Sequence, residues 1–209
     1  MRRALAFFLI VVAFLATAPA WAMTFRHAET SSGLTVVIAT GEIKRGDTKR
    51  LSQALEEAGR DKYGTKQIYL DSPGGLVVEA MKMAGVLEAA EVTVIVRKDT
   101  VCASACASIL FVAGKYRTVE NGGKLAIHSC YDTFTGKPQT ECNMMISAYA
   151  EHLGLNGDAM MALHEAAGDA LIVFDREDAA CFGLTRKPGS RASKKTPPCI
   201  ADMMRELGQ

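Results

Sequence analysis

A serine in a run of small and apolar residues is the feature of this sequence best suited to covalent chemistry. Ser104 lies in the segment Val101–Gly114, which reads VCASACASILFVAG and follows a β-branched stretch at Val92–Arg97. This pattern predicts a strand, a tight turn and then a helix. At such a junction the serine hydroxyl projects from the turn, and the first amides of the helix face incoming negative charge. The pattern therefore makes Ser104 a candidate nucleophile.

Two further features could complete a site around this serine. The turn Asp71-Ser72-Pro73-Gly74-Gly75 leads into a predicted helix, so its amides could bind an anion. His128 ends an apolar stretch and, with an ordinary pKa near 6.5, could take and return a proton. Each feature also has a structural explanation, because small residues ease tight packing, glycines make turns, and histidines occur at strand ends.

The elements that must position these residues alternate between strands and helices. Strands are predicted over 35–43, 67–70, 92–97 and 123–128, and helices over 47–58, 76–90, 105–112, 142–153 and 158–167. Asp47 is a predicted N-cap, and Asp175 is predicted to cap a short last helix with Asp178 in a capping-box position. The alternation is typical of an α/β domain with a largely parallel sheet. Binding sites in such domains collect at the carboxyl ends of strands, where all three candidate groups fall.

The order of these motifs resembles a known family. Thr-Gly-Glu-Ile, Ile-Tyr-Leu-Asp-Ser-Pro-Gly-Gly, the serine at a helix start and the Ile-His pair follow one another as in the proteolytic subunit of the Clp protease. The run Cys102–Cys106 is more similar still to exported, ClpP-like bacterial proteins. The similarity covers roughly Leu34–Leu184. It implies a ClpP/crotonase-like spiral of ββα units, a serine peptidase site, a peptide or unfolded protein as substrate, and a homo-oligomer.

The resemblance also implies roles for individual residues. Ser104 matches the nucleophile and His128 the general base, while Gly74 and Gly75 match one side of the oxyanion hole and the Ala105 amide the other. Counting back from Phe182-Gly183-Leu184 puts the family's triad aspartate at Leu171. Asp169 is two residues away, and we expect it to be the third member. Ser108, one helical turn beyond Ser104, is interpreted as a packing residue, and His152 and His164 as surface residues.

The six cysteines indicate disulfides in an oxidising compartment. Locality favours the pairs Cys130–Cys142, Cys181–Cys199 and Cys102–Cys106. A metal site built from Cys102, Cys106, His128 and Cys130 is a rival interpretation, but the chain has no Cys-x-x-Cys pair. A free catalytic thiol is another, which an oxidising compartment disfavours. We expect neither a metal nor a cofactor.

The amino terminus has the pattern of a secretory signal peptide. Arg2 and Arg3 precede the apolar stretch Ala4–Ala16, and Ala20-Trp21-Ala22 is a small-x-small cleavage signal. We expect a leader over 1–22, cleaved after Ala22, although an uncleaved anchor has a similar pattern. A single domain over 23–185 and a polar tail over 186–209 follow, with the tail held by Cys199. We therefore expect a periplasmic or secreted protein.

The charge balance of the remaining chain is close to neutral. Removing the leader removes two arginines and no acid, which takes the formal charge from +1 to −1. A near-neutral chain gives no reason to expect nucleic acid or an anionic membrane surface as a partner.

Three functions remain open from the sequence. The first is a serine peptidase, and the second is a catalytically inactive ClpP-like binding or assembly module. The third is a Ser–Lys peptidase with Lys137 as base, although a lysine in a polar loop rarely has a lowered pKa.

Overall fold

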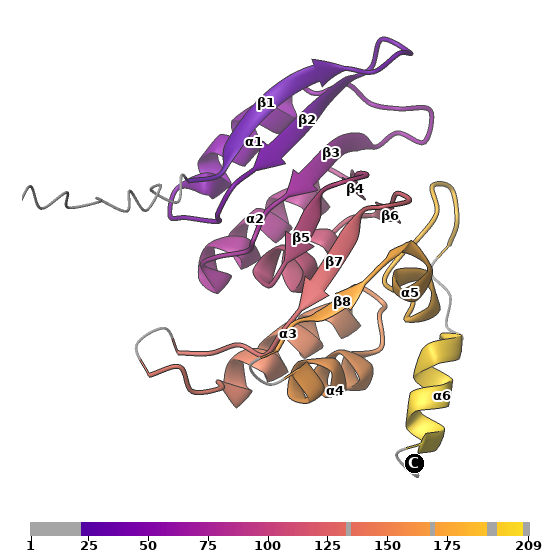
Figure 1. Cartoon of the computed structure of the whole chain (residues 1–209). Helices are drawn as coiled ribbons and strands as arrows, with labels where there is room; N and C mark the ends of the chain where they lie inside the picture. Colours follow the sequence, from indigo (N-terminus) through magenta and orange to yellow (C-terminus); the bar gives the residue numbers. More distant parts are fainter. Residues whose placement is uncertain (1–21, 133–134, 168–169, 192–195, 207–209) are drawn as a thin grey trace, which may run out of the picture.

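The protein is an α/β domain built on two sheets (Figure 1). The computed structural model describes residues 22–132, 135–167, 170–191 and 196–206. The five-stranded sheet has the order β1-β2-β3-β4-β6, and the three-stranded sheet has the order β5-β7-β8. The strands are β1 (Thr24–Glu29), β2 (Thr35–Thr40), β3 (Lys66–Asp71), β4 (Val92–Val96), β5 (Val101–Ala103), β6 (Tyr116–Val119), β7 (Lys124–Ile127) and β8 (Ile172–Phe174).

Most strand pairs are parallel, as the sequence predicts. Strands β2, β3, β4 and β6 run parallel, as do β5 and β7, while β1 and β8 are antiparallel edge strands. Strands β2 and β4 are buried along most of their length, which fits their largely apolar, β-branched sequences. An α/β fold with a mostly parallel mixed sheet is thereby confirmed.

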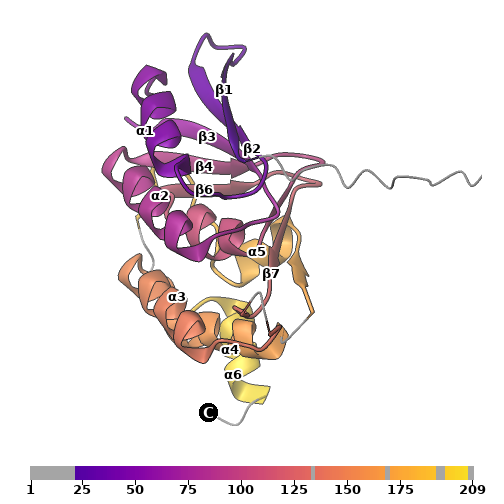
Figure 2. The ribbon, with the colours of Figure 1, turned by 90° about the vertical axis from the view of Figure 1, so that its left-hand side faces the viewer.

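Helices cover the sheets and connect their strands. They are α1 (Asp47–Glu57), α2 (Val77–Ala89), η1 (Cys106–Phe111), α3 (Thr140–His152), α4 (Gly157–Ala167), α5 (Arg176–Cys181) and α6 (Pro198–Glu206), of which η1 is a short π-helix. Helices α1 and α2 lie on one face of the five-stranded sheet (Figure 2). Their inner side chains, including Leu51, Leu55, Met83 and Leu87, are almost fully buried against the strands.

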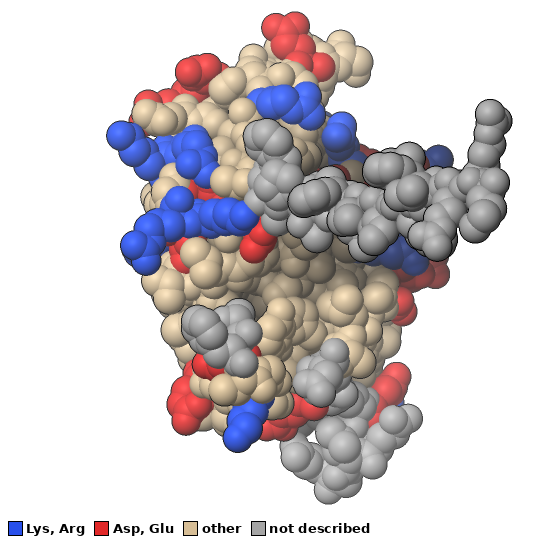
Figure 3. Space-filling model, turned by 60° about the vertical axis from the view of Figure 1, so that its left-hand side comes forward, with Lys and Arg blue, Asp and Glu red and all other residues tan. Residues whose placement is uncertain are grey.

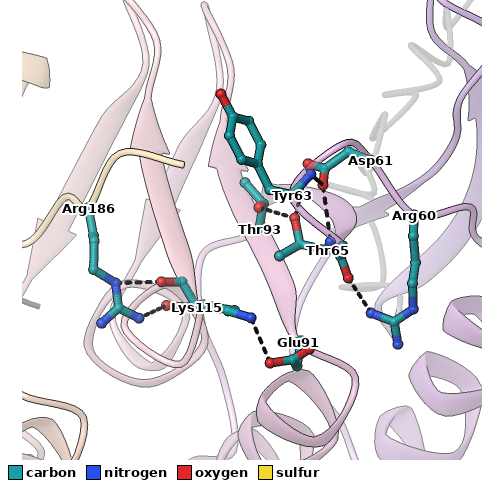
Figure 4. A network of polar contacts seen from close by, with 10 residues as sticks. Arg60, Asp61, Tyr63, Thr65, Glu91, Thr93, Lys115 and Arg186 are labelled. Atoms are coloured by element: carbon teal, nitrogen blue, oxygen red, sulfur yellow. Dashed lines mark hydrogen bonds and ion pairs between the residues drawn. The ribbon is translucent and has the colours of Figure 1, made fainter. Parts of the chain in front are cut away.

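Polar contacts tie together the amino ends of the parallel strands (Figure 4). Thr65, just before β3, hydrogen-bonds Thr93 of β4 at 2.7 Å, and both hydroxyls are buried. Lys115, just before β6, pairs with Glu91, just before β4, at 2.6 Å, and its carbonyl accepts from Arg186. These contacts occupy the end of the sheet opposite the candidate residues, which lie at the carboxyl ends.

All three predicted disulfides are present. They join Cys102 to Cys106, Cys130 to Cys142 and Cys181 to Cys199. Three disulfides are compatible with an extracellular or periplasmic protein. The predicted leader lies outside the described residues apart from Ala22. In the described ranges, no helix has both the length and the apolar character needed to span a membrane.

The structure adds elements that the sequence patterns did not predict. Strands β1, β5, β6 and β8 are short or partly polar, and α6 forms within the segment interpreted as a polar tail. Asp47 is the first residue of α1 and not its N-cap, which is Gly46. The Asp175 capping box is confirmed, with the Asp175 side chain accepting from the amides of Glu177 and Asp178.

Candidate active site

Ser104 occupies a strained turn between strand β5 and helix η1. Its φ is +56°, a left-handed conformation that is uncommon for a residue other than glycine. Its amide donates to the Ala126 carbonyl of β7 at 2.8 Å, and its carbonyl accepts from the Ser108 amide at 2.9 Å. The hydroxyl, which is partly exposed, has no hydrogen-bond partner among the described residues. The backbone is therefore fixed while the hydroxyl is left available.

The Gly74–Gly75 turn packs directly against this serine. A Cβ atom on Gly74 would lie 2.6 Å from Ser104 Cβ and 2.7 Å from the Ala103 carbonyl oxygen. One on Gly75 would lie 2.3 Å from the Ile43 carbonyl oxygen, so neither position has room for a side chain. Both glycines have positive φ, at +98° and +141°.

The turn is held in place by the segment after β2. Ile43 donates its amide to the Gly74 carbonyl at 2.7 Å and accepts from the Leu76 amide at 3.0 Å. The Gly74 amide donates to the Ser72 hydroxyl at 3.1 Å. Within the described residues, the amides of Gly75 and Ala105 donate to no other group. Both are therefore free to stabilise an oxyanion formed at Ser104.

His128 follows β7, is partly exposed, and lines the same cavity as Ser104. Its Nδ1 lies 2.6 Å from the carbonyl oxygen of Ser129. Because a carbonyl can only accept, Nδ1 carries the proton and Nε2 has the free lone pair. This is the tautomer that a general base needs. In the described part of the chain, no hydrogen bond joins His128 to Ser104.

The third member of the predicted triad is not a described residue. Asp169 lies outside the described residues, so its predicted role is untested. Leu171, where the resemblance predicted the triad aspartate, is exposed and lines a second cavity with Ser104 and His128. The Ser129 carbonyl thus supplies the acceptor at Nδ1 that a triad carboxylate would otherwise provide.

The candidate residues converge on a cavity of about 610 Å³. It is lined by Gly74, Gly75, Ser104, Ala105 and His128, so residues from three distant parts of the chain meet there. The second cavity, of about 450 Å³, adjoins it at Ser104, His128 and Tyr131. A larger cavity, of about 760 Å³, lies beside Arg117 and Arg186 and contains none of the candidates.

The surroundings of the cavity carry little charge. Glu42 is the single Asp, Glu, Lys or Arg side chain in the described lining, and Lys44 pairs with it at 3.3 Å. Leu76, Tyr131 and Leu171, which line the two cavities, are more than half exposed. In Figure 3, Lys and Arg side chains gather over the upper part of the face shown, and the centre is mostly uncharged.

The cavity is also lined by a second serine–histidine pair, which corrects the interpretation of His164 as a surface residue. His164 was expected at the surface, yet it is 1% exposed, and its Nε2 lies 3.2 Å from the Ser108 hydroxyl. Ser108 is buried, as expected of a packing residue, but it also lines the cavity. Burial, opposed by a hydrogen bond to the Met160 carbonyl and aided by nearby His128, lowers the pKa of His164. A lone histidine in a helix has no sequence pattern that reveals this position.

The alternative sites suggested by the sequence gain little support. All six cysteines are in disulfides, so none is a thiol or a thiolate ligand. Lys137 is exposed and is absent from the described lining of both cavities at Ser104. His152 is exposed, as predicted.

Comparisons with known proteins give no family assignment. No protein-family model matches the sequence. No curated protein matches it at a significant level. A function for this protein is therefore inferred from the chemistry and geometry of its own residues.

Proposed function

We propose that this protein is an exported serine peptidase of the Clp type, with Ser104 as nucleophile and His128 as general base. The observation that carries the proposal is the strained Ser104 turn, which opens into a cavity shared with His128 and two free amides. The proposal includes the ClpP/crotonase-like spiral of ββα units that the motif order implies. The three disulfides support export.

The proposed reaction has two steps. The Ser104 oxygen attacks the carbonyl carbon of a peptide bond, its proton passes to His128 Nε2, and the amides of Gly75 and Ala105 donate to the oxyanion. His128 then gives the proton to the leaving amine as the carbon–nitrogen bond breaks. Water then attacks the acyl carbon and gives a proton to His128, the bond from that carbon to the Ser104 oxygen breaks, and His128 returns the proton to the Ser104 oxygen. The Ser129 carbonyl accepts from Nδ1 of His128 in both the neutral and the protonated form of the ring, so Nε2 is the nitrogen that gains and loses the proton.

In this proposal the resting site must tighten before reaction, because Ser104 and His128 share no hydrogen bond. Catalytic contacts are often long without substrate and shorten in the complex. The Ser104 hydroxyl has no competing partner among the described residues, so no existing hydrogen bond opposes its movement toward His128.

Labelling with a fluorophosphonate probe tests the proposal. The wild-type protein should be labelled at Ser104, as located by peptide mass spectrometry, and Ser104→Ala should abolish labelling. His128→Gln should slow labelling by about 10²- to 10⁴-fold, because the base is lost. Ser147→Ala is the matched control, since Ser147 is buried and outside the described lining of the cavity. Equal labelling of Ser104→Ala and wild type would contradict the proposal.

A second candidate function is a catalytically inactive module of the same fold that binds or assembles. The missing Ser104–His128 hydrogen bond favours it, as does the Cys102–Cys106 disulfide beside the serine. Wild-type protein that stays unlabelled, even after mild reduction, would support this alternative.

The expected substrate of the peptidase is a peptide or an unfolded protein. Its expected assembly is a homo-oligomer, which light scattering after gel filtration would reveal.

A further inference from the structure

Two buried polar side chains line the cavity at Ser104 beside apolar ones. Ser108 of η1 and His164 of α4 are 2% and 1% exposed, yet both line the cavity. Val77 and Ile146 also line it, together with the disulfide between Cys130 and Cys142. The buried hydrogen-bonded pair therefore lies beside apolar side chains, while Glu42, Gln139 and Tyr131 line other parts of the cavity.

The proton positions in this pair follow from its neighbours. His164 Nδ1 lies 2.7 Å from the Met160 carbonyl oxygen, which can only accept, so Nδ1 carries the proton. Nε2 is then an acceptor, and the Ser108 hydroxyl donates to it across 3.2 Å. The Ser108 oxygen keeps a lone pair with no partner among the described residues. The pair thus presents an acceptor to the cavity and no free donor.

The pair is poorly placed to be a second nucleophilic centre. The Ser108 amide is occupied by the Ser104 carbonyl, whereas the free amides lie beside Ser104. An oxyanion formed at Ser108 would therefore lack the donors that acyl transfer needs. Ser108 lies four positions beyond Ser104 in the chain, and both residues line the same cavity. A substrate carbonyl held at Ser104 could therefore place an aromatic side chain in the part of this cavity that Ser108 lines.

We propose that Ser108 and His164 form the floor of a side-chain pocket that selects tyrosine on the acyl side of the bond cleaved at Ser104. The inference rests on the proposed function. The apolar walls accept the ring, and the phenol hydroxyl donates to the Ser108 oxygen. Phenylalanine fills the same walls but leaves the buried oxygen unpaired, which is unfavourable. A glutamate side chain, when ionised, finds no free donor at the Ser108–His164 pair.

A pair of peptidyl diphenyl phosphonates that differ by one hydroxyl tests this inference. One carries tyrosine next to the phosphorus and the other phenylalanine, and Ser104 displaces phenol from either. We expect wild-type protein to react about 3- to 10-fold faster with the tyrosine probe, the value of one neutral hydrogen bond. Ser108→Ala should bring the ratio of the two rates to about one. Ser147→Ala, which removes a buried hydroxyl outside the described lining, should keep the wild-type ratio.

The outcomes separate this inference from the proposed function. A wild-type ratio near one overturns the pocket assignment even if Ser108→Ala fails to fold, and leaves Ser104 as nucleophile. An unchanged ratio in folded Ser108→Ala overturns it equally. If neither probe labels wild-type protein, the proposed function fails and the pocket with it. Labelling found on Ser108 in place of Ser104 contradicts both assignments.

Discussion

Ser104 and Gly74 form one interlocked unit. A non-glycine residue at positive φ costs roughly 1 kcal/mol, and the hydrogen bonds to Ala126 and from Ser108 hold Ser104 in that conformation. Gly74 lies so close that a Cβ atom there would overlap Ser104 and the Ala103 carbonyl. The conformation of the serine therefore depends on the absence of a side chain at position 74.

Replacing Gly74 with alanine should damage the site and the fold together. We expect Gly74→Ala to slow labelling by about 10²-fold, comparable to losing an oxyanion donor. It should also lower the free energy of unfolding by about 1–3 kcal/mol, because φ is +98°. The labelling rate and urea denaturation measure the two effects.

Gly85→Ala is the matched control for this substitution. Gly85 lies in α2 and is exposed, and a Cβ atom added to it would have no neighbouring atom within 4 Å. Alanine there should stabilise the protein by about 0.5–1 kcal/mol and leave labelling unchanged. Wild-type labelling by Gly74→Ala would show that the close approach of the two residues is unimportant.

The sequence could reveal Ser104, His128 and the glycine turn, because their residue types and order carry a chemical meaning. It could not reveal the contact between Ser108 and His164, which lie 56 positions apart and meet only through the packing of α4 on η1. The contact between His128 and the Ser129 carbonyl could not be predicted either, because every residue has a backbone carbonyl and no residue type marks this one.

At the scale of elements, a buried carboxylate connects α2 to the start of α1. Glu79 Oε1 of α2 accepts from the amides of Gly46 and Thr48 at 3.0 and 2.9 Å and from the Thr48 hydroxyl at 2.8 Å. These contacts order the segment that contains Ile43, which in turn binds the Gly74–Gly75 turn. The glycine turn is thus supported from a helix that does not reach Ser104 itself.

The contribution of Glu79 to the free energy of unfolding should depend on pH. The Thr48 amide is the largest cause that lowers the pKa of Glu79 below its ordinary 4.5, so the folded state favours the carboxylate. We expect Glu79→Gln to lower the free energy of unfolding by about 1–3 kcal/mol at neutral pH. The deficit should shrink as pH falls below about 4.5, because the wild-type carboxylate then gains a proton and loses its advantage.

Urea denaturation at several pH values measures this difference. Glu56→Gln is the matched control, because Glu56 is an exposed carboxylate in the last turn of α1. It should have little effect at any pH. A deficit in Glu79→Gln that stays constant down to pH 3 would contradict the assigned role of the carboxylate.

The short strands explain why part of the fold could not be predicted. β6 contains Arg117, a residue type typical of a surface, yet it is 4% exposed. Its guanidinium donates to the carbonyls of Leu184, Val112 and Gly114, and burial, with Arg186 nearby, lowers its pKa to about 9. β5 has three residues, too few for a periodic pattern. The longer element α2 was predictable as an amphipathic helix, and β4 was predictable from its β-branched residues.

At the scale of the whole molecule, the three disulfides differ in burial. Cys102 and Cys106, on either side of Ser104, are both fully buried, whereas Cys181 and Cys199 are partly exposed. Because thiol–disulfide exchange requires access to sulfur, we expect graded reduction to break Cys181–Cys199 before Cys102–Cys106.

Alkylation of the released thiols, followed by peptide mass spectrometry, gives the order of reduction. Fluorophosphonate labelling should persist after Cys181–Cys199 opens and decline once Cys102–Cys106 is reduced. The double variant Cys181→Ser/Cys199→Ser is the control, and it should retain wild-type labelling. Reduction of Cys102–Cys106 first would mean that the Ser104 turn opens more readily than its burial implies.

The oxygen that orients His128 belongs to a peptide bond. Such an atom gains no proton at any pH in which proteins operate, and no single codon change can delete it. The imidazole therefore keeps its orienting neighbour in acid, where a carboxylate would be neutralised, and under mutation, where a side chain would be lost. The orientation of the ring therefore depends on the backbone conformation at residues 128–129 and not on the side chain at position 129.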